Sequence, residues 1–139
     1  MIVNTAYIYM GNGGAPVNPN LWQDGVSNYP VVFTNSSISS DGLLLSGTSD
    51  ATFSELTLTG FNSLTLSGSA NTVFSSISIT VEFFNSTGKL LGTETAAFSK
   101  SAETKAVNIP SSAKIKNAKI KFTKATSANT VTINSAVLT

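Results

Sequence analysis

Apolar and polar side chains alternate without interruption along residues 76–83, within the expected strand 76–84. The apolar positions are Ile77, Ile79, Val81 and Phe83, and the polar positions are Ser76, Ser78, Thr80 and Glu82. Successive side chains of an extended chain point to opposite faces, so this pattern predicts a strand with one buried face. Elsewhere, no stretch of eleven residues keeps apolar positions at helical spacing without Gly, Pro or clusters of Ser and Thr. We therefore expect an all-β protein.

Similar but shorter patterns predict further strands. The expected strands cover residues 2–9, 43–46, 53–59, 64–67, 76–84, 90–98, 105–109, 114–123 and 130–138. Gly88 ends the loop after residue 84 and predicts a hairpin there, because glycine readily adopts positive φ. The apolar parity slips near Asn117-Ala118, which predicts a β-bulge. We expect a single-domain jelly-roll β-sandwich over residues 1–139, with about 8–9 antiparallel strands. Its irregular, loop-rich N-terminal part is expected at about residues 10–35.

The side-chain inventory excludes several kinds of chemistry. The 139 residues include no cysteine and no histidine, and all eight basic residues are lysines. Disulfides, thiol nucleophiles, zinc–thiolate sites and catalytic triads that use histidine are therefore absent. Ser, Thr and Asn together account for 52 residues, while only 11% of the chain is charged. This composition is typical of proteins that face an external medium, such as adhesins, fibres and carbohydrate-binding modules.

The seven carboxylates do not form a recognisable catalytic motif. A glycosidase needs two facing carboxyl groups, and the sequence pairs none of them. We expect a non-enzymatic protein with no catalytic residues, no metal and no cofactor. A calcium ion held by Asp24, Asp41 or Asp50 with backbone carbonyls is the alternative, because calcium takes oxygen ligands. The favoured interpretation is structural, since Asp24 and Asp41 each precede a glycine, as in turns.

The eight lysines all lie in residues 89–139, and five of them form a stripe. The stripe consists of Lys114, Lys116, Lys119, Lys121 and Lys124. Nucleic-acid binding by such a patch would also use arginine or interleaved aromatic side chains. Only Phe122 lies among these lysines, and its parity points inward. We therefore expect a solvated strand face, or an edge strand that lysine protects from aggregation, and no nucleic-acid partner.

The aromatic side chains supply the candidate ligand-binding residues. These candidates are Trp22, Tyr7, Tyr9, Tyr29 and Phe84. Sugar sites combine aromatic faces with hydroxyl and amide hydrogen bonds, and this chain is rich in both. The alternative for Trp22, the only tryptophan, is a core plug or an interface anchor.

Targeting signals are also missing. The chain has no run of 18 apolar residues, so we expect no membrane span and no membrane partner. Residues 1–10 lack the basic start and long apolar stretch of a signal peptide. An exterior-type composition without an export signal predicts release by cell lysis, as part of a virus particle.

Over a little more than half its length, the chain resembles galactose-binding-like jelly rolls, which include carbohydrate-binding modules and structural proteins of tailed phages. The segments that carry the resemblance are Phe61-Asn-Ser-Leu-Thr-Leu, Ile77-Ser-Ile-Thr-Val-Glu-Phe-Phe-Asn-Ser-Thr-Gly-Lys-Leu-Leu, Val107-Asn-Ile-Pro-Ser-Ser-Ala-Lys, Ile120-Lys-Phe-Thr and Val131-Thr-Ile-Asn-Ser-Ala-Val-Leu. The resemblance implies a long strand, a hairpin, a proline turn and two closing strands. It assigns no binding residue, because the ligand loops of such domains vary.

Together these observations predict a non-enzymatic phage virion protein, such as a capsid decoration, a head fibre or a tail-attached module. Its expected partners are other virion proteins and glycans of the host surface. The alternative is a carbohydrate-binding module of a secreted bacterial protein. The oligomeric state stays open, with a homo-oligomer as one alternative, because no coiled-coil heptad fixes a subunit number.

Overall fold

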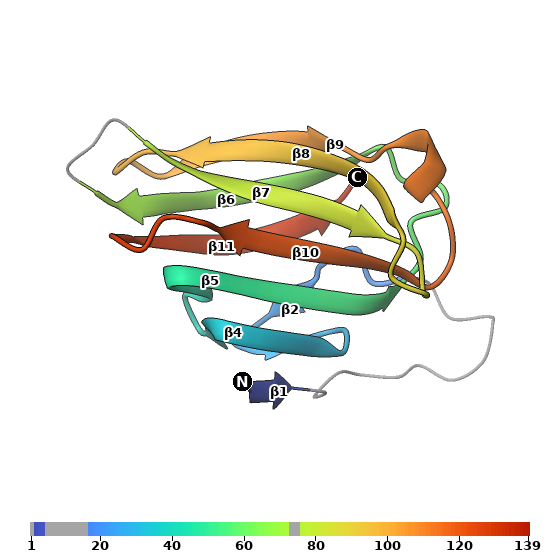
Figure 1. The fold of residues 1–139 in the computed structure, drawn as a ribbon, viewed down its shortest axis with the longest axis horizontal. Coiled ribbons are helices and arrows are strands. Elements are labelled where there is room, and N and C mark those ends of the chain that lie inside the picture. The colour runs from blue at the N-terminus through green and yellow to red at the C-terminus, as the bar shows by residue number, and fades with distance from the viewer. Residues whose placement is uncertain (1, 5–16, 73–75) are drawn as a thin grey trace.

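The structure, a computed structural model, describes residues 2–4, 17–72 and 76–139. The strands are β1 (Ile2–Asn4), β2 (Trp22–Gln23), β3 (Val26–Ser27), β4 (Val31–Ser39), β5 (Gly42–Leu56), β6 (Ser63–Asn71), β7 (Ile77–Phe84), β8 (Leu90–Phe98), β9 (Glu103–Asn108), β10 (Ala118–Lys124) and β11 (Thr130–Leu138), and the 3₁₀ helix η1 covers Ser111–Ala113. All strand pairs are antiparallel within the described residues. The predicted all-β fold is confirmed (Figure 1).

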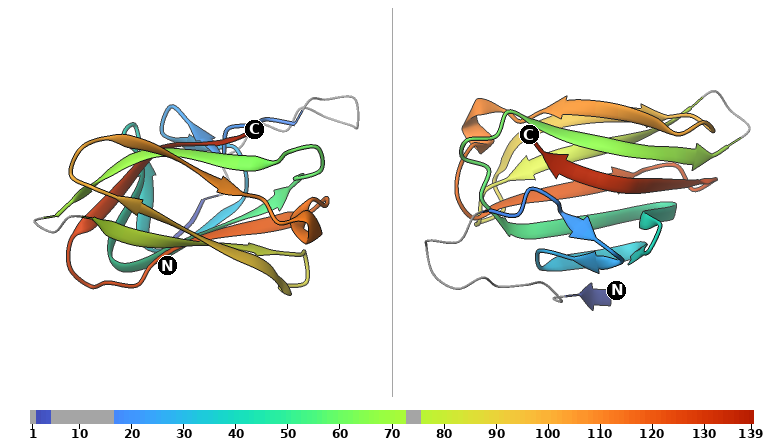
Figure 2. Two further views of the ribbon diagram at one scale, coloured as in Figure 1. Left: turned by 90° about the horizontal axis from the view of Figure 1, so that it is seen from above. Right: turned by 180° about the vertical axis from the view of Figure 1, so that it is seen from behind.

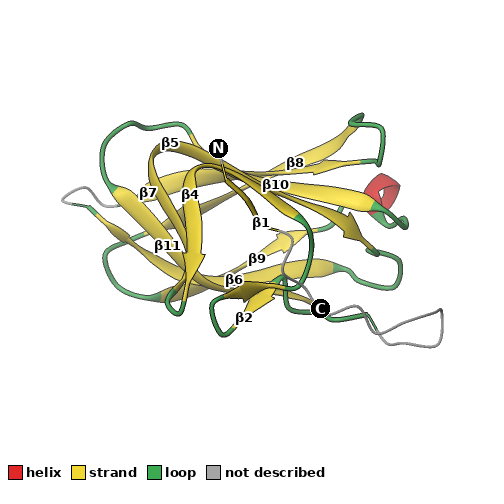
Figure 3. Cartoon of the chain, turned by 90° about the horizontal axis from the view of Figure 1, so that it is seen from below, coloured by secondary structure: helices red, strands yellow, loops and turns green. Residues whose placement is uncertain are grey.

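The long strand β5 belongs to both layers of a β-sandwich. Its residues 43–46 pair with β11, and its residues 49–56 pair with β10. The first layer is therefore β8-β7-β10 with the second part of β5, and the second layer is β9-β6-β11 with the first part. Strand β4 pairs with β5 on both sides of the bend. Figure 3 shows the two layers facing each other.

The bend between the layers has a local cause in each strand. Gly47 of β5 has φ 71°, which glycine adopts without steric cost. Asn35 of β4 has φ 50° at a register shift between Thr34 and Ser36. Its side-chain Nδ2 donates a hydrogen bond to the Thr48 carbonyl at 3.0 Å. Asparagine tolerates this backbone region better than most residues, so both strands turn the corner together.

The core lies between the two layers and is made of alternate strand residues. Its largest members with no exposed surface are Phe53, Phe83, Phe98 and Phe122, joined by Leu21, Leu43, Leu45, Leu56, Leu58, Leu64 and Leu66. Burial of each such side chain stabilises the fold by about 1.5–3 kcal/mol. No helix of the described residues is long and apolar enough to cross a membrane.

Several predicted elements are confirmed with their boundaries. Strands β8 and β11 cover the expected 90–98 and 130–138, and β7 begins one residue later than expected. Gly88 has φ 92° in the hairpin between β7 and β8. A register shift follows Ala118, next to Asn117 at φ 56°, where the bulge was expected.

Three expectations on individual strands are wrong. Residues 43–46 and 53–59 were expected to form two strands, but they lie largely in the single strand β5, because the glycine between them bends the strand instead of ending it. Strand β4 was not expected, since its second half is almost entirely polar. The expected strand 114–123 begins only at Ala118, and β10 is a central strand between β7 and β5, so its lysines do not protect an edge.

Candidate functional site

The predicted ligand-binding tryptophan lies in the core. Trp22 is only 4% exposed, and its ring stacks on Phe53 with centroids 5.6 Å apart. It also meets the edge of Phe122, at 6.2 Å and an interplanar angle of 71°. Its Nε1 donates a hydrogen bond to the Asn134 carbonyl at 3.0 Å. In this position Trp22 offers no ring face to a sugar, in keeping with the core-plug alternative.

The other predicted aromatic residues do not gather around one site. Tyr29 is half-buried, and its hydroxyl donates to the Asn18 carbonyl at 2.6 Å. Burial raises the pKa of the Tyr29 hydroxyl. Phe84 is partly exposed on the outer side of β7, beside Lys119 and Leu90 on the neighbouring strands. Tyr7 and Tyr9 lie outside the described residues.

The outer face of the first layer is charged. One row of side chains crosses it in register: Thr93, Glu82, Lys121, Thr52 and Val32. Lys119 lies on the same face of β10, next to Phe84. The solvated strand face expected for the lysine stripe is thus found for Lys119 and Lys121, whereas Lys124 is fully buried.

The outer face of the second layer is different, because its central side chains carry no charge. Strands β4, β5, β11 and β6 lie side by side there (Figure 2, right panel). The strand registers place two rows of side chains across them. The first row is Ser37, Leu44, Thr132 and Ser69, and the second is Ser46, Thr130 and Asn71 with Asn35 at its β4 end. Strands are spaced by about 4.8 Å, so each row is about 14 Å long. We call these eight side chains the neutral face.

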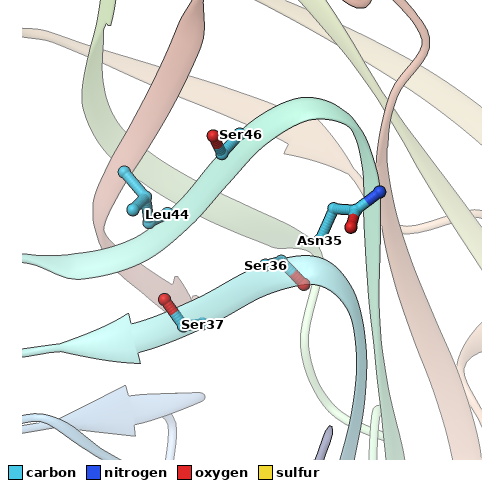
Figure 4. A pocket seen from close by; sticks show the side chains of 5 residues that line it. All are labelled: Asn35, Ser36, Ser37, Leu44 and Ser46. Atoms are coloured by element: carbon cyan, nitrogen blue, oxygen red, sulfur yellow. The ribbon is translucent and has the colours of Figure 1, made fainter. Parts of the chain in front are cut away.

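An open pocket of about 360 Å³ lies at the β4–β5 end of the neutral face. It is lined by Asn35, Ser36, Ser37, Leu44 and Ser46 (Figure 4). Ser37, Leu44 and Ser46 point to the same side of the two strands. Leu44 is 36% exposed, an apolar patch among hydroxyl groups. Pockets of this size are typical of small-molecule sites, which combine apolar contact with a few placed polar groups.

The acidic residues of the described chain do not converge. No three of them form a group that could hold a metal ion within residues 2–4, 17–72 and 76–139. In the strands, Asp50 lies opposite Thr34 and Thr123, Glu82 opposite Thr93 and Lys121, and Glu94 opposite Val81. The calcium alternative, with Asp24, Asp41 or Asp50 and backbone carbonyls as ligands, stays a prediction.

The neutral face could not be predicted from the sequence. The polar residues between Leu43 and Ser46 and along residues 130–138 alternate with apolar ones, which indicates an outer face. Their placement side by side depends on the register of β5 with β11 and of β11 with β6. That register joins segments about 60 to 90 residues apart, so no local pattern could supply it.

No model of a known protein family matches this chain, and no curated protein sequence matches it. Among solved structures, it is similar to the CBM36-1 domain of a multidomain xylanase from the hindgut metagenome of Trinervitermes trinervoides, with 16% identity, a TM-score of 0.52, and 70% of this chain and 77% of that one covered. It is also similar to TmCBM61 in complex with β-1,4-galactotriose, with 12% identity, a TM-score of 0.57, and 88% of this chain and 94% of that one covered.

A third neighbour is described as one of the carbohydrate-binding modules from the β-sandwich superfamily, with promiscuous specificity. It is 8% identical, has a TM-score of 0.55, and is matched over 88% of this chain and 61% of that one. At these identities the likeness establishes the fold: the chain is a jelly-roll β-sandwich like those of carbohydrate-binding modules.

Proposed function

We propose that this chain is a non-catalytic module that binds an uncharged glycan on its neutral face. The observation that carries the proposal is the chemistry of that face: seven of its eight side chains are Ser, Thr or Asn, and the eighth is Leu44. Hydroxyls and amides both donate and accept hydrogen bonds, as the hydroxyl groups of a neutral sugar do. A charged ligand would find no counter-charge among these side chains.

The fold neighbours support this proposal. Two are carbohydrate-binding modules by name, and one was solved with β-1,4-galactotriose. These likenesses favour the carbohydrate-binding module, our sequence-based alternative, over the virion protein.

The arrangement of the acids supports a binding role without catalysis. Glycoside hydrolysis uses two carboxyl groups on either side of the scissile bond. In the described strands no acid lies directly opposite another acid, and the neutral face contains none. We therefore expect glycans to be bound and released unchanged.

The test is binding to a panel of neutral poly- and oligosaccharides, measured by titration calorimetry, with two matched variants. Ser46→Lys places a charge on the neutral face, and Thr95→Lys places the same charge on the outer side of β8. Both positions are exposed strand residues, so both variants should fold. We expect saturable binding that Ser46→Lys weakens at least about tenfold and Thr95→Lys leaves unchanged, because a buried unpaired charge is costly.

Absence of binding to every glycan in the panel, by a protein that circular dichroism shows to be folded, would reject the proposed function. Equal loss of binding in both variants would place the site elsewhere.

The virion setting is a separate prediction that rests on the exterior-type composition and the phage resemblance. Mass spectrometry of gradient-purified particles from the source would test it. Detection only in the soluble fraction of lysed cells would contradict it.

A further inference from the structure

The pocket on the neutral face contains two side chains that are held in fixed positions. Asn35 uses its Nδ2 to donate to the Thr48 carbonyl at 3.0 Å, which leaves its Oδ1 as an acceptor. Ser36 donates its hydroxyl hydrogen to the Asp50 carbonyl at 2.6 Å. Because these bonds tie the side chains to the corner of β4 and β5, the acceptor of Asn35 is preorganised at the pocket wall.

Two other pocket residues keep their donors available. The hydroxyl groups of Ser37 and Ser46 make no side-chain hydrogen bond within the described part of the chain. Ser37 lies directly opposite Leu44 in the β4–β5 register, and Ser46 lies two residues beyond Leu44 on the same face. The pocket thus combines a fixed acceptor, two free hydroxyl donors and an aliphatic surface.

An acetamido group has the complementary set of features in one planar unit. Its N–H can donate to Asn35 Oδ1, its carbonyl can accept from Ser37 or Ser46, and its methyl group can lie against Leu44. A hydroxyl in the same place would set a polar group against Leu44, which is unfavourable without a compensating hydrogen bond. We infer that this pocket holds the acetamido group of an N-acetylated neutral sugar. The inference rests on the proposed function, since it names the sugar class bound at the same face.

The experiment compares oligosaccharides that differ only in this group. The probes are the β-1,4-linked trimers of N-acetylglucosamine and of glucose, and the monosaccharide pair of N-acetylgalactosamine and galactose. Affinities are measured by NMR titration of the isotope-labelled full chain. We expect the acetylated member of at least one pair to bind about tenfold or more tightly, with intermolecular contacts between its methyl group and the Leu44 methyl groups.

Two leucine variants make the test specific. Leu44→Ser should reduce the affinity for the acetylated sugar to that for its unacetylated partner. Leu90→Ser is the matched control, because Leu90 is 48% exposed on β8, on the other layer. It should leave the preference unchanged.

Each remaining outcome overturns the inference in a distinguishable way. Equal affinity within both pairs, or binding of other neutral glycans but of neither acetylated sugar, would reject the acetamido pocket and leave the proposed function standing. A preference unchanged in Leu44→Ser, or shift changes confined to β7 and β10, would place the acetamido group elsewhere. No binding of any neutral glycan would reject the proposed function as well.

Discussion

The indole of Trp22 makes two kinds of contact, and each can be removed separately. The ring packs on Phe53 and Phe122, while Nε1 bonds to the Asn134 carbonyl, which lies at a register shift of β11. Trp22→Phe keeps most of the packing and should lower the unfolding free energy by about 1 kcal/mol, the typical value of one hydrogen bond. Trp22→Ala should lower it by about 3–5 kcal/mol. Denaturant titration measures both changes.

Because the ring is buried, Trp22→Phe should also leave glycan affinity unchanged. If this variant kept its stability but lost binding, the expectation from sequence that Trp22 contacts the sugar would be supported.

Glu103 should make the stability of the fold depend on pH in the acid range. The Ser99 hydroxyl donates to Oε2 at 2.6 Å, and Lys105 Nζ lies 2.9 Å from Oε1. These contacts, the Ser99 bond first, lower the pKa of Glu103 from 4.5 to about 2. The folded state therefore favours the carboxylate. The stabilisation is complete above the unfolded pKa and is lost as the pH falls from there through the folded pKa.

The measurement is the unfolding free energy of wild type and Glu103→Gln as a function of pH. The difference should be constant above about pH 5 and should shrink as the pH approaches 2. Glu94→Gln is the control, because Glu94 makes no side-chain hydrogen bond in the described part of the chain. A difference that does not change with pH would show that the contacts do not favour the charged form.

At the scale of elements, Lys124 links the loop between β10 and β11 to the bend of β5 through hydrogen bonds. It has no exposed surface, and its Nζ donates to the carbonyls of Gly47 at 2.9 Å, Thr126 at 2.6 Å and Ala128 at 2.9 Å. Burial lowers the pKa of the ammonium group. Three converging carbonyls are an arrangement that hard cations also use. The ammonium group thus acts as a cation built into the chain at this corner.

Lys124→Met keeps the length of the side chain but leaves the three carbonyls without their shared donor. We expect the unfolding free energy to fall by about 1–3 kcal/mol, the cost of leaving buried polar groups unsatisfied. The change for exposed Lys116→Met should stay within about 0.5 kcal/mol. Thermal and denaturant unfolding compare the two variants. Equal stability would mean that the loop and bend hold together without the ammonium group.

The strands that could be predicted show period-two alternation within their own segment. In β7 the buried residues lie at every second position throughout. In β8 they do so only near the end of the strand, and in β11 the alternation shifts by one position at the register shift between Ile133 and Ser135. The sequence predicted two strands in place of β5, because Gly47 is equally compatible with a turn and with a bend. Only the strands that pair with β5 on either side of Gly47 decide between the two. Strand β4 could not be predicted, because pairing with β5, and not its own hydrophobicity, holds its polar half in place.

At the scale of the whole molecule, the two outer faces differ in charge: the outer face of the first layer carries charged side chains, and the neutral face of the second layer carries none. Glu82, Lys119 and Lys121 lie on the first layer, and the neutral face occupies the second. The composition predicted a surface dominated by hydroxyls and amides. It could not predict which outer face carries the charged side chains, because the bend of β5 decides which layer each segment joins. The same limit applies to the site: Leu44, Thr130 and Asn71 become neighbours only through long-range register.

This difference in charge predicts how glycan binding responds to salt. Raising the ionic strength from about 0.1 M to about 1 M shortens the screening length from about 10 Å to about 3 Å and weakens exposed charge interactions. Binding on the neutral face uses no charge, so its affinity should change less than about twofold. Binding of an acidic glycan on the first layer would instead involve Lys119 and Lys121, and its affinity should fall with salt. Calorimetric titrations at both salt concentrations, repeated with Lys121→Glu, separate the two. A steep salt dependence, or loss of affinity in Lys121→Glu, would place the site on the first layer. Phe84, which lies beside Lys119 there, would then be expected to contact the ligand, as the sequence predicts.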